Sequence, residues 1–119
     1  MREVYIKFLQ ELELPFIEQE DGVIVMDEET ITIYVDLRKE IDVRILYKLH
    51  LSEEEKEKYK KASVGMIEYY PSDQGVWFHR YPVSFEAVSE DQLPERVEYY
   101  IEKIETMAFL ILGDIKKCN

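Results

Sequence analysis

The chain has very little cysteine, glycine or proline, and it has no long hydrophobic run. Its single cysteine, Cys118, cannot form a disulfide within the chain, which predicts a reducing compartment. The four glycines are scattered, so no glycine cluster is present to cradle a phosphate. The longest uncharged apolar stretch, residues 106–113, is far shorter than the roughly 20 residues that cross a bilayer. The start, MREVYIKF, carries charges where an export signal needs an apolar run, so we expect a cytoplasmic protein.

Residues that usually carry chemistry are few or lack the required spacing. His50 and His79 are far apart in the sequence and have no neighbouring cysteine or spaced histidine, which disfavours a metal site. No G-x-S-x-G motif is present, and the serines fall where caps and turns explain them. The acidic runs lack the spacing of a calcium loop. We therefore expect no catalytic residue, no metal and no cofactor, and we expect that the protein is not an enzyme.

The charge is strongly of one sign. Twenty-six acidic residues face 15 basic ones, which gives a formal net charge of −11. Such a field repels phosphate backbones and anionic lipid, and the basic clusters at 56–61 and 116–117 form no stripe that would overcome it. We expect neither nucleic acid nor a membrane as a partner. The Glu- and Lys-rich composition resembles that of thermophile proteins.

A length of 119 residues with 46% hydrophobic residues is enough for one core, and no linker or repeat divides the chain. We therefore predict a single domain over 1–119. Apolar residues at three- and four-residue spacing predict a helix over 2–12. Asp21-Gly22 between apolar runs predicts a hairpin, and clean alternation predicts strands over 31–37 and 41–49.

The second half begins with a capping-box match, in which Ser52 and Glu55 start a polar helix that we expect to run to about Ala62. A hairpin over the loop 71–75 follows, and a long helix then runs to about Leu112 or beyond, with Gly113 as a possible C-cap. The fold predicted is α+β, a bent antiparallel sheet with the N- and C-terminal helices packed on one face, in the order α-β-β-β(-β)-α-β-β-α. Residues 107–112 are apolar nearly all round, so they need cover on a second side, from the first helix or from another subunit.

The stretch GVWFHRY, residues 75–81, is the densest group of aromatic and basic residues. If a five-residue loop 71–75 closes the hairpin, alternation gives one face a set of candidate protein-binding residues. These residues are Ile67, Tyr69, Trp77, His79 and Tyr81. Trp, Tyr and Arg are enriched where interfaces concentrate their binding energy. An ordinary half-exposed sheet surface explains the same pattern, whereas a nucleobase-stacking platform conflicts with the charge.

Two stretches resemble the secretion-chaperone-like fold, which is shared by class I type III secretion chaperones and YbjN-like proteins. They are EDGVIVMDEETITIYVDL (20–37), a short strand and an alternating strand, and VWFHRYPVSFEAVSEDQLPERVEYYIEKIETMAFLIL (76–112), a strand, a loop and a closing helix. The resemblance implies a homodimer that holds an extended segment of a partner protein and has no catalytic residues. In the secretion chaperones the middle helix often builds the dimer interface. Here that helix is mostly Glu and Lys, so the hairpin after it is the better candidate.

We therefore predict a non-catalytic protein-binding module, chaperone- or adaptor-like and homodimeric. The alternative is a small-ligand-binding domain with a pocket between the sheet and the C-terminal helix. An apolar cavity lined by Tyr47, Tyr100 and Met107 would favour that alternative. A structural subunit of a larger complex is a third hypothesis, because fold alone does not determine function.

Overall fold

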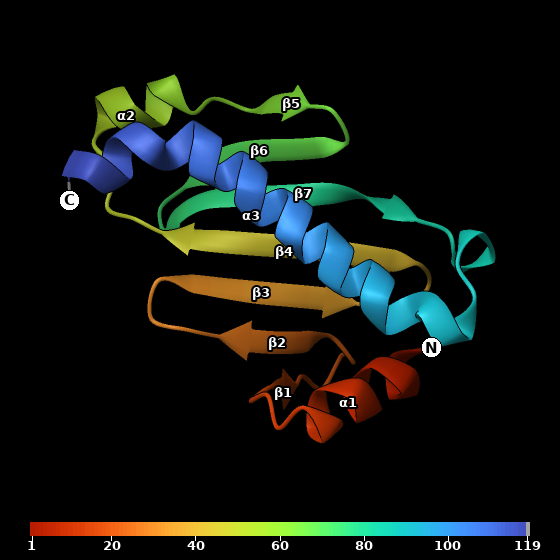
Figure 1. Ribbon diagram of the computed structural model, residues 1–119. Coiled ribbons are helices and arrows are strands. Elements are labelled where there is room, and N and C mark those ends of the chain that lie inside the picture. The colour runs from red at the N-terminus through yellow and green to blue at the C-terminus, as the bar shows by residue number, and fades with distance from the viewer. Residues whose placement is uncertain (119) are drawn as a thin grey trace.

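A computed structural model describes the backbone of residues 1–118 and the side chains up to Gly113. The basic residues 116–117 and the side chain of Cys118 lie outside the described side chains. The elements, shown in Figure 1, are α1 (Arg2–Glu11), β1 (Ile17–Glu18), β2 (Ile24–Asp27), β3 (Ile31–Asp36), β4 (Ile41–Lys48), α2 (Glu53–Lys58), β5 (Ala62–Val64), β6 (Ile67–Ser72), β7 (Gly75–Val83), the short 3₁₀ turns Phe85–Ala87 and Glu90–Gln92, and α3 (Leu93–Cys118).

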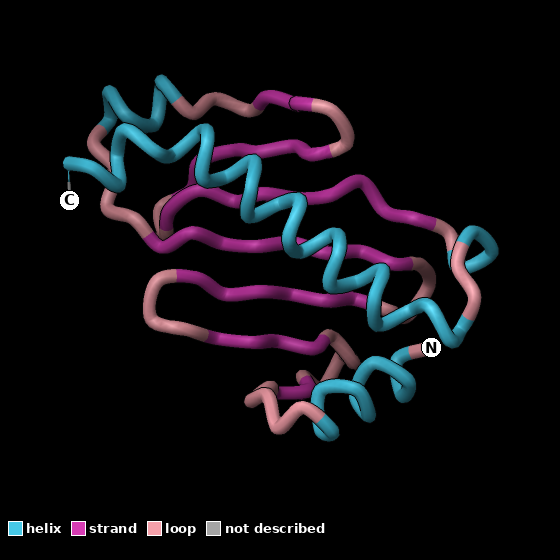
Figure 2. Tube along the Cα trace, in the orientation of Figure 1, coloured by secondary structure: helices cyan, strands magenta, loops and turns pink. Residues whose placement is uncertain are grey.

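Within residues 1–118 the strands form one seven-stranded sheet in the order β1-β2-β3-β4-β7-β6-β5 (Figure 2). Every neighbouring pair is antiparallel. Two meanders, β1 to β4 and β5 to β7, therefore meet where β4 pairs with β7. The predicted α+β class, the antiparallel sheet and the terminal helices are confirmed.

α1 and α3 cover one face of this sheet, and none of the helices in residues 1–118 lies over the other face. α3 crosses the sheet diagonally, and α1 lies on the same side beside the β1–β2 edge (Figure 1). The Tyr5 hydroxyl of α1 donates a hydrogen bond of 2.8 Å to the Glu98 carboxylate of α3 and so links the two helices. The core lies between sheet and helices. Its fully buried members include Leu9, Ile24, Val35, Val43, Ile45, Val76, Phe78, Val97, Ile104 and Ala108.

Local sequence signals explain most of the turns. The Asp21-Gly22 hairpin is confirmed, with Gly22 at a φ of +93° that an L side chain adopts only at a cost. The capping box at α2 is also confirmed. The Ser52 hydroxyl accepts from the Glu55 amide at 3.1 Å, and the Glu55 carboxylate accepts from the Ser52 amide at 3.0 Å. α2 nevertheless ends at Lys58, because the chain then turns into β5, a strand that the sequence analysis did not predict.

The predicted five-residue loop at 71–75 is wrong. Ser72 pairs with Gly75, so the hairpin turns on Asp73 and Gln74 alone, and Pro71 lies inside β6 opposite Val76. The proposed C-cap at Gly113 is wrong as well, since α3 continues through this residue to Cys118. The hairpin error has the larger consequence, because a slip of one residue in register moves side chains to the opposite face of a sheet.

Candidate functional site

The corrected register divides the predicted binding residues between the two faces. Tyr69 lies opposite Phe78, which is fully buried, so Tyr69 and its same-face neighbour Ile67 point toward the helices. The predicted shared face for all five candidates is therefore wrong. Trp77 and His79 point to the uncovered face.

Tyr81 also lies on the uncovered face. Its hydroxyl is 2.6 Å from the Ser63 hydroxyl, and Ser63 stands opposite Glu68 in the same row of the sheet as His79. The structure therefore brings three of the predicted residues, Trp77, His79 and Tyr81, to the face without helices and separates them from Ile67 and Tyr69.

Three rings gather on the uncovered face, and we call Tyr34, Tyr70 and Trp77 the open-face aromatic cluster. The centroids of Tyr34 and Trp77 are 5.4 Å apart at 42°, and Tyr70 stands directly opposite Trp77 on β6. Leu46, the β4 neighbour of Trp77, is only 4% exposed although no helix covers it. We attribute this burial to the rings, because Trp77 lies directly opposite Leu46 on β7. Tyr34, which packs against Trp77, lies diagonally across from Leu46 on β3, where Thr32 is the direct neighbour.

A polar group borders the cluster. His79 Nε2 lies 2.7 Å from Asp42 Oδ1, and the two side chains are only 15% and 16% exposed. Arg44 Nε lies 3.6 Å from the same carboxylate oxygen, and the Arg44 side chain is 45% exposed. Burial by itself raises the pKa of Asp42. The hydrogen bond from His79 and the charges of His79 and Arg44 outweigh burial, so this pKa lies below its ordinary value.

Around these groups the surface forms a hollow of about 350 Å³. On its far side Arg38 makes a two-pronged contact with Asp36, at 3.0 Å from Nε and 2.8 Å from the terminal nitrogen. The residues that line the hollow are Gln19, Asp21, Val23, Tyr34, Asp36, Arg38, Asp42, Arg44, Tyr70 and Trp77. Charged side chains of both signs thus line the hollow beside the three half-buried rings, and the Asp36–Arg38 and Asp42–Arg44 ion pairs hold four of them in place.

The paired Asp42 and His79 raise the question of catalysis. An aspartate beside a histidine can orient the imidazole ring for proton transfer in hydrolases. Such chemistry also needs a nucleophile, and the residues that line the hollow include no serine, threonine or cysteine. Within the described part of the chain, no three His, Cys, Asp or Glu side chains are placed to hold a metal ion together. No described helix is long and apolar enough to cross a membrane.

The sequence pattern did not single out four residues of the hollow, Tyr34, Tyr70, Asp42 and Arg44. Three of them had a usable signal, since Tyr34, Asp42 and Arg44 alternate with the buried residues of two well-predicted strands. With the turn misplaced over 71–75, alternation puts Tyr70 on the same face as Phe78, whereas in the structure Tyr70 stands opposite Trp77. Nothing local in the sequence indicates that β4 pairs with β7, and that pairing is what brings Asp42 to His79.

The chain matches no protein-family model, no curated protein and no solved structure.

Proposed function

We propose that this protein is a non-catalytic protein-binding module, chaperone- or adaptor-like, that holds a partner protein on the uncovered face of its sheet. The observation that carries the proposal is the open-face aromatic cluster, which lies half-buried in a hollow bordered by the exposed guanidinium of Arg44. Trp, Tyr and Arg are the residues that most often dominate binding energy at protein interfaces.

The charged side chains of the hollow form a polar rim around its aromatic centre. Asp36 is held by Arg38, and Asp42 is held by His79 and Arg44, so these side chains lose little freedom when a partner binds. A suitable partner segment places an aromatic or aliphatic side chain against Trp77 and polar groups against the rim. The observed order of elements is the order predicted from the sequence with β5 added.

The proposal includes a homodimer that uses the outer side of α3. Phe109 and Leu110 are 65% and 70% exposed there, and large apolar side chains this accessible on adjacent positions of a helix favour burial against another surface. The second copy supplies that surface through the same side of its own α3, as a two-fold axis requires. α2 consists only of Glu and Lys and is a poor alternative interface, and the hairpin that the sequence favoured for the dimer is proposed here as the surface for the partner protein.

The partner-binding face is tested by affinity capture from the native cell with the full chain as bait. The variants Trp77→Ala and Arg44→Ala should lose a partner that the wild type retains, because each removes a central contact of the hollow. Leu12→Ala is the matched control, since Leu12 is 54% exposed and lies outside the hollow. Against the purified partner, each site variant should weaken binding at least about tenfold.

Circular dichroism of each variant separates loss of binding from loss of fold, which matters for Trp77 because its ring covers Leu46. Arg44→Ala leaves that packing in place, so it tests the face independently. If both variants keep every partner that the wild type and Leu12→Ala capture, the uncovered face is not the binding surface and the proposed function is wrong.

A further inference from the structure

A second candidate site lies on the opposite face, between α3 and the β5–β6 turn. Because α3 crosses the sheet diagonally, it leaves this corner of the helix-covered face without cover (Figure 1). The corner forms an apolar groove of about 360 Å³. It is lined by Val64, Gly65, Met66, Ile67, Arg80, Tyr99, Tyr100, Lys103, Thr106 and Met107. Tyr100 and Met107 thus line an open groove, whereas Tyr47 packs edge-on against Phe78 within the core.

The charges of this groove are opposite to those of the whole chain. Arg80 and Lys103 are its charged lining residues, and both are cations, in a chain of net charge −11. Among the described residues, neither cation forms an ion pair with a carboxylate. Arg80 instead donates to the Tyr81 carbonyl at 2.7 Å.

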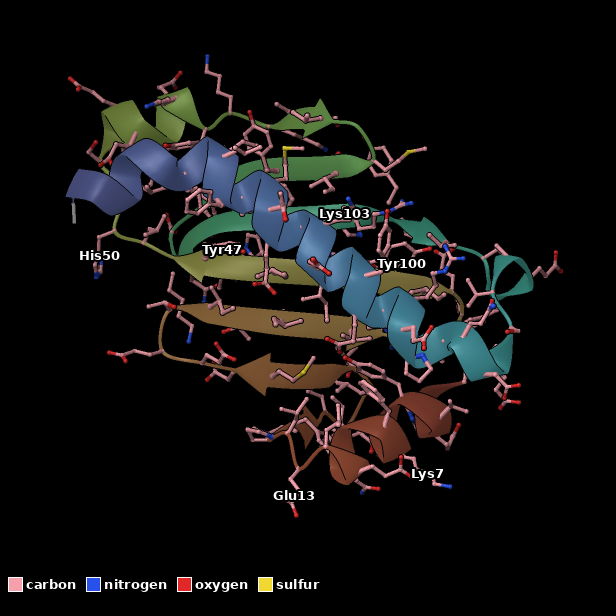
Figure 3. All side chains as sticks on the ribbon, viewed as in Figure 1. Lys7, Glu13, Tyr47, His50, Tyr100 and Lys103 are labelled. Atoms are coloured by element: carbon pink, nitrogen blue, oxygen red, sulfur yellow. The ribbon has the colours of Figure 1, made fainter. Side chains whose placement is uncertain are left out.

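Both cations are held over aromatic rings of the groove. The Arg80 guanidinium lies 4.9 Å from the Tyr100 ring centroid, and Lys103 Nζ lies 5.3 Å from the Tyr99 centroid. Figure 3 labels Tyr100 and Lys103 on the side of α3 that faces β7. Two restrained cations beside an apolar floor make a site in which an anionic group and a hydrocarbon chain are accommodated together.

We propose that this groove binds an amphipathic monoanion, a slim aliphatic chain that ends in a carboxylate. The carboxylate lies between Arg80 and Lys103, and the chain covers Met66, Val64 and Met107. Met66 and Val64 are 59% and 41% exposed without a ligand, so a bound chain removes apolar surface from water on both sides of the contact.

The size of the groove favours a slim ligand, and its charge favours an anionic one. Its volume of about 360 Å³ is near the lower limit for small-ligand sites, which suits a single slim chain. A neutral chain would leave both cations without an anionic partner. A cationic chain would meet two like charges at the groove.

The test is calorimetric titration of the full chain with octanoate, decanoate and dodecanoate below their micelle concentrations. Each added methylene should tighten binding about twofold to fourfold while the chain lies in the groove. Decyltrimethylammonium should bind at least about tenfold more weakly than decanoate. Absence of decanoate binding, or equal affinity for the cationic analogue, would overturn the proposal.

Two variants locate the site. Lys103→Gln should weaken decanoate binding about fivefold to tenfold and leave 1-decanol unaffected, because it removes one charge from an exposed position. Lys7→Gln is the matched control, an exposed lysine on α1 that is distant from the groove (Figure 3). Met66→Asp should weaken both ligands.

Sedimentation of the same variants distinguishes a second copy as the occupant. If Met66→Asp dissociates a dimer while decanoate does not bind the wild type, a neighbouring copy covers the groove and the ligand proposal is wrong. Equal decanoate affinity in Lys103→Gln and Lys7→Gln would also reject it. None of these outcomes depends on Trp77 or on the uncovered face, so the proposed partner-binding face is tested separately.

Discussion

At the scale of single residues, the most informative group is the carboxylate of Asp42. It accepts from His79 in a position that is mostly shielded from water, on a sheet face where an unpaired charge would be costly. Its alternation with Val43 on β4 predicts that Asp42 points away from the core, but its partner lies 37 positions later in the chain. Position on a strand is a local property, whereas the hydrogen bond depends on the pairing of β4 with β7.

We predict that Asp42→Asn lowers the free energy of unfolding by about 1–2 kcal/mol at pH 7, because the charge-assisted hydrogen bond to His79 is weakened. The pKa of Asp42 is lower in the folded protein than its ordinary value of 3.8. The stabilisation is therefore fully present above about pH 4 and is lost as the pH falls through the folded-state pKa.

Urea unfolding of both proteins between pH 7 and pH 2.5 measures this difference. The two stability curves should converge at the acidic end. Glu20→Gln is the control, since Glu20 is exposed and forms no ion pair among the described residues, and its curve should follow the wild type at every pH. A constant gap between the wild type and Asp42→Asn down to pH 2.5 would show that packing, and not the carboxylate charge, is responsible.

At the scale of elements, the sequence predicts helices and strands that have a regular apolar spacing or a cap signal. It predicts the turns that connect them less well. The alternation of residues 31–37 and 41–49 identifies β3 and β4, and the capping box identifies the start of α2. The β6–β7 turn is ambiguous, because PSDQG contains turn formers at nearly every position. Proline is rare within strands, which favoured a loop at Pro71, yet in the folded protein Pro71 pairs with Val76 and the tighter turn prevails.

Gly75 provides a direct test of that tight turn. Its φ is +144°, and a Cβ atom at this position would overlap the Tyr47 carbonyl oxygen of the neighbouring strand. We predict that Gly75→Ala lowers stability by more than about 3 kcal/mol, because backbone atoms cannot move aside as a flexible side chain can.

Gly65→Ala is the matched control, because Gly65 also has a positive φ, +61°, but no atom lies within 4 Å of its Cβ position. It should cost only about 1–2 kcal/mol, the price of the left-handed conformation alone. Thermal or urea unfolding of the two variants measures both losses. Equal losses would contradict the close approach of β4 and β7 at this turn.

At the scale of the whole molecule, the sequence indicates that some apolar surface needs cover, but it does not indicate what covers that surface. The all-round apolar character of residues 107–112 predicted a need for cover on two sides, and the structure supplies it on one. Ala108 and Leu112 are buried, and Phe109 and Leu110 remain exposed. The open-face aromatic cluster needed more than local pattern, because Tyr34, Tyr70 and Trp77 meet only when two meanders join in one register.

The proposed dimer gives the last prediction. Leu110→Lys should raise the dimer dissociation constant at least about 100-fold, because it removes apolar contact area and places a charge where α3 packs on its partner copy. Leu12→Lys makes the same exchange at an exposed leucine outside α3 and should leave the dimer unchanged. Sedimentation velocity across a concentration series measures both constants. A wild type that stays monomeric at high micromolar concentration, or a Leu110→Lys variant that dimerises as the wild type does, would exclude the outer side of α3 as the interface, and the exposed pair Phe109 and Leu110 would then need a different partner.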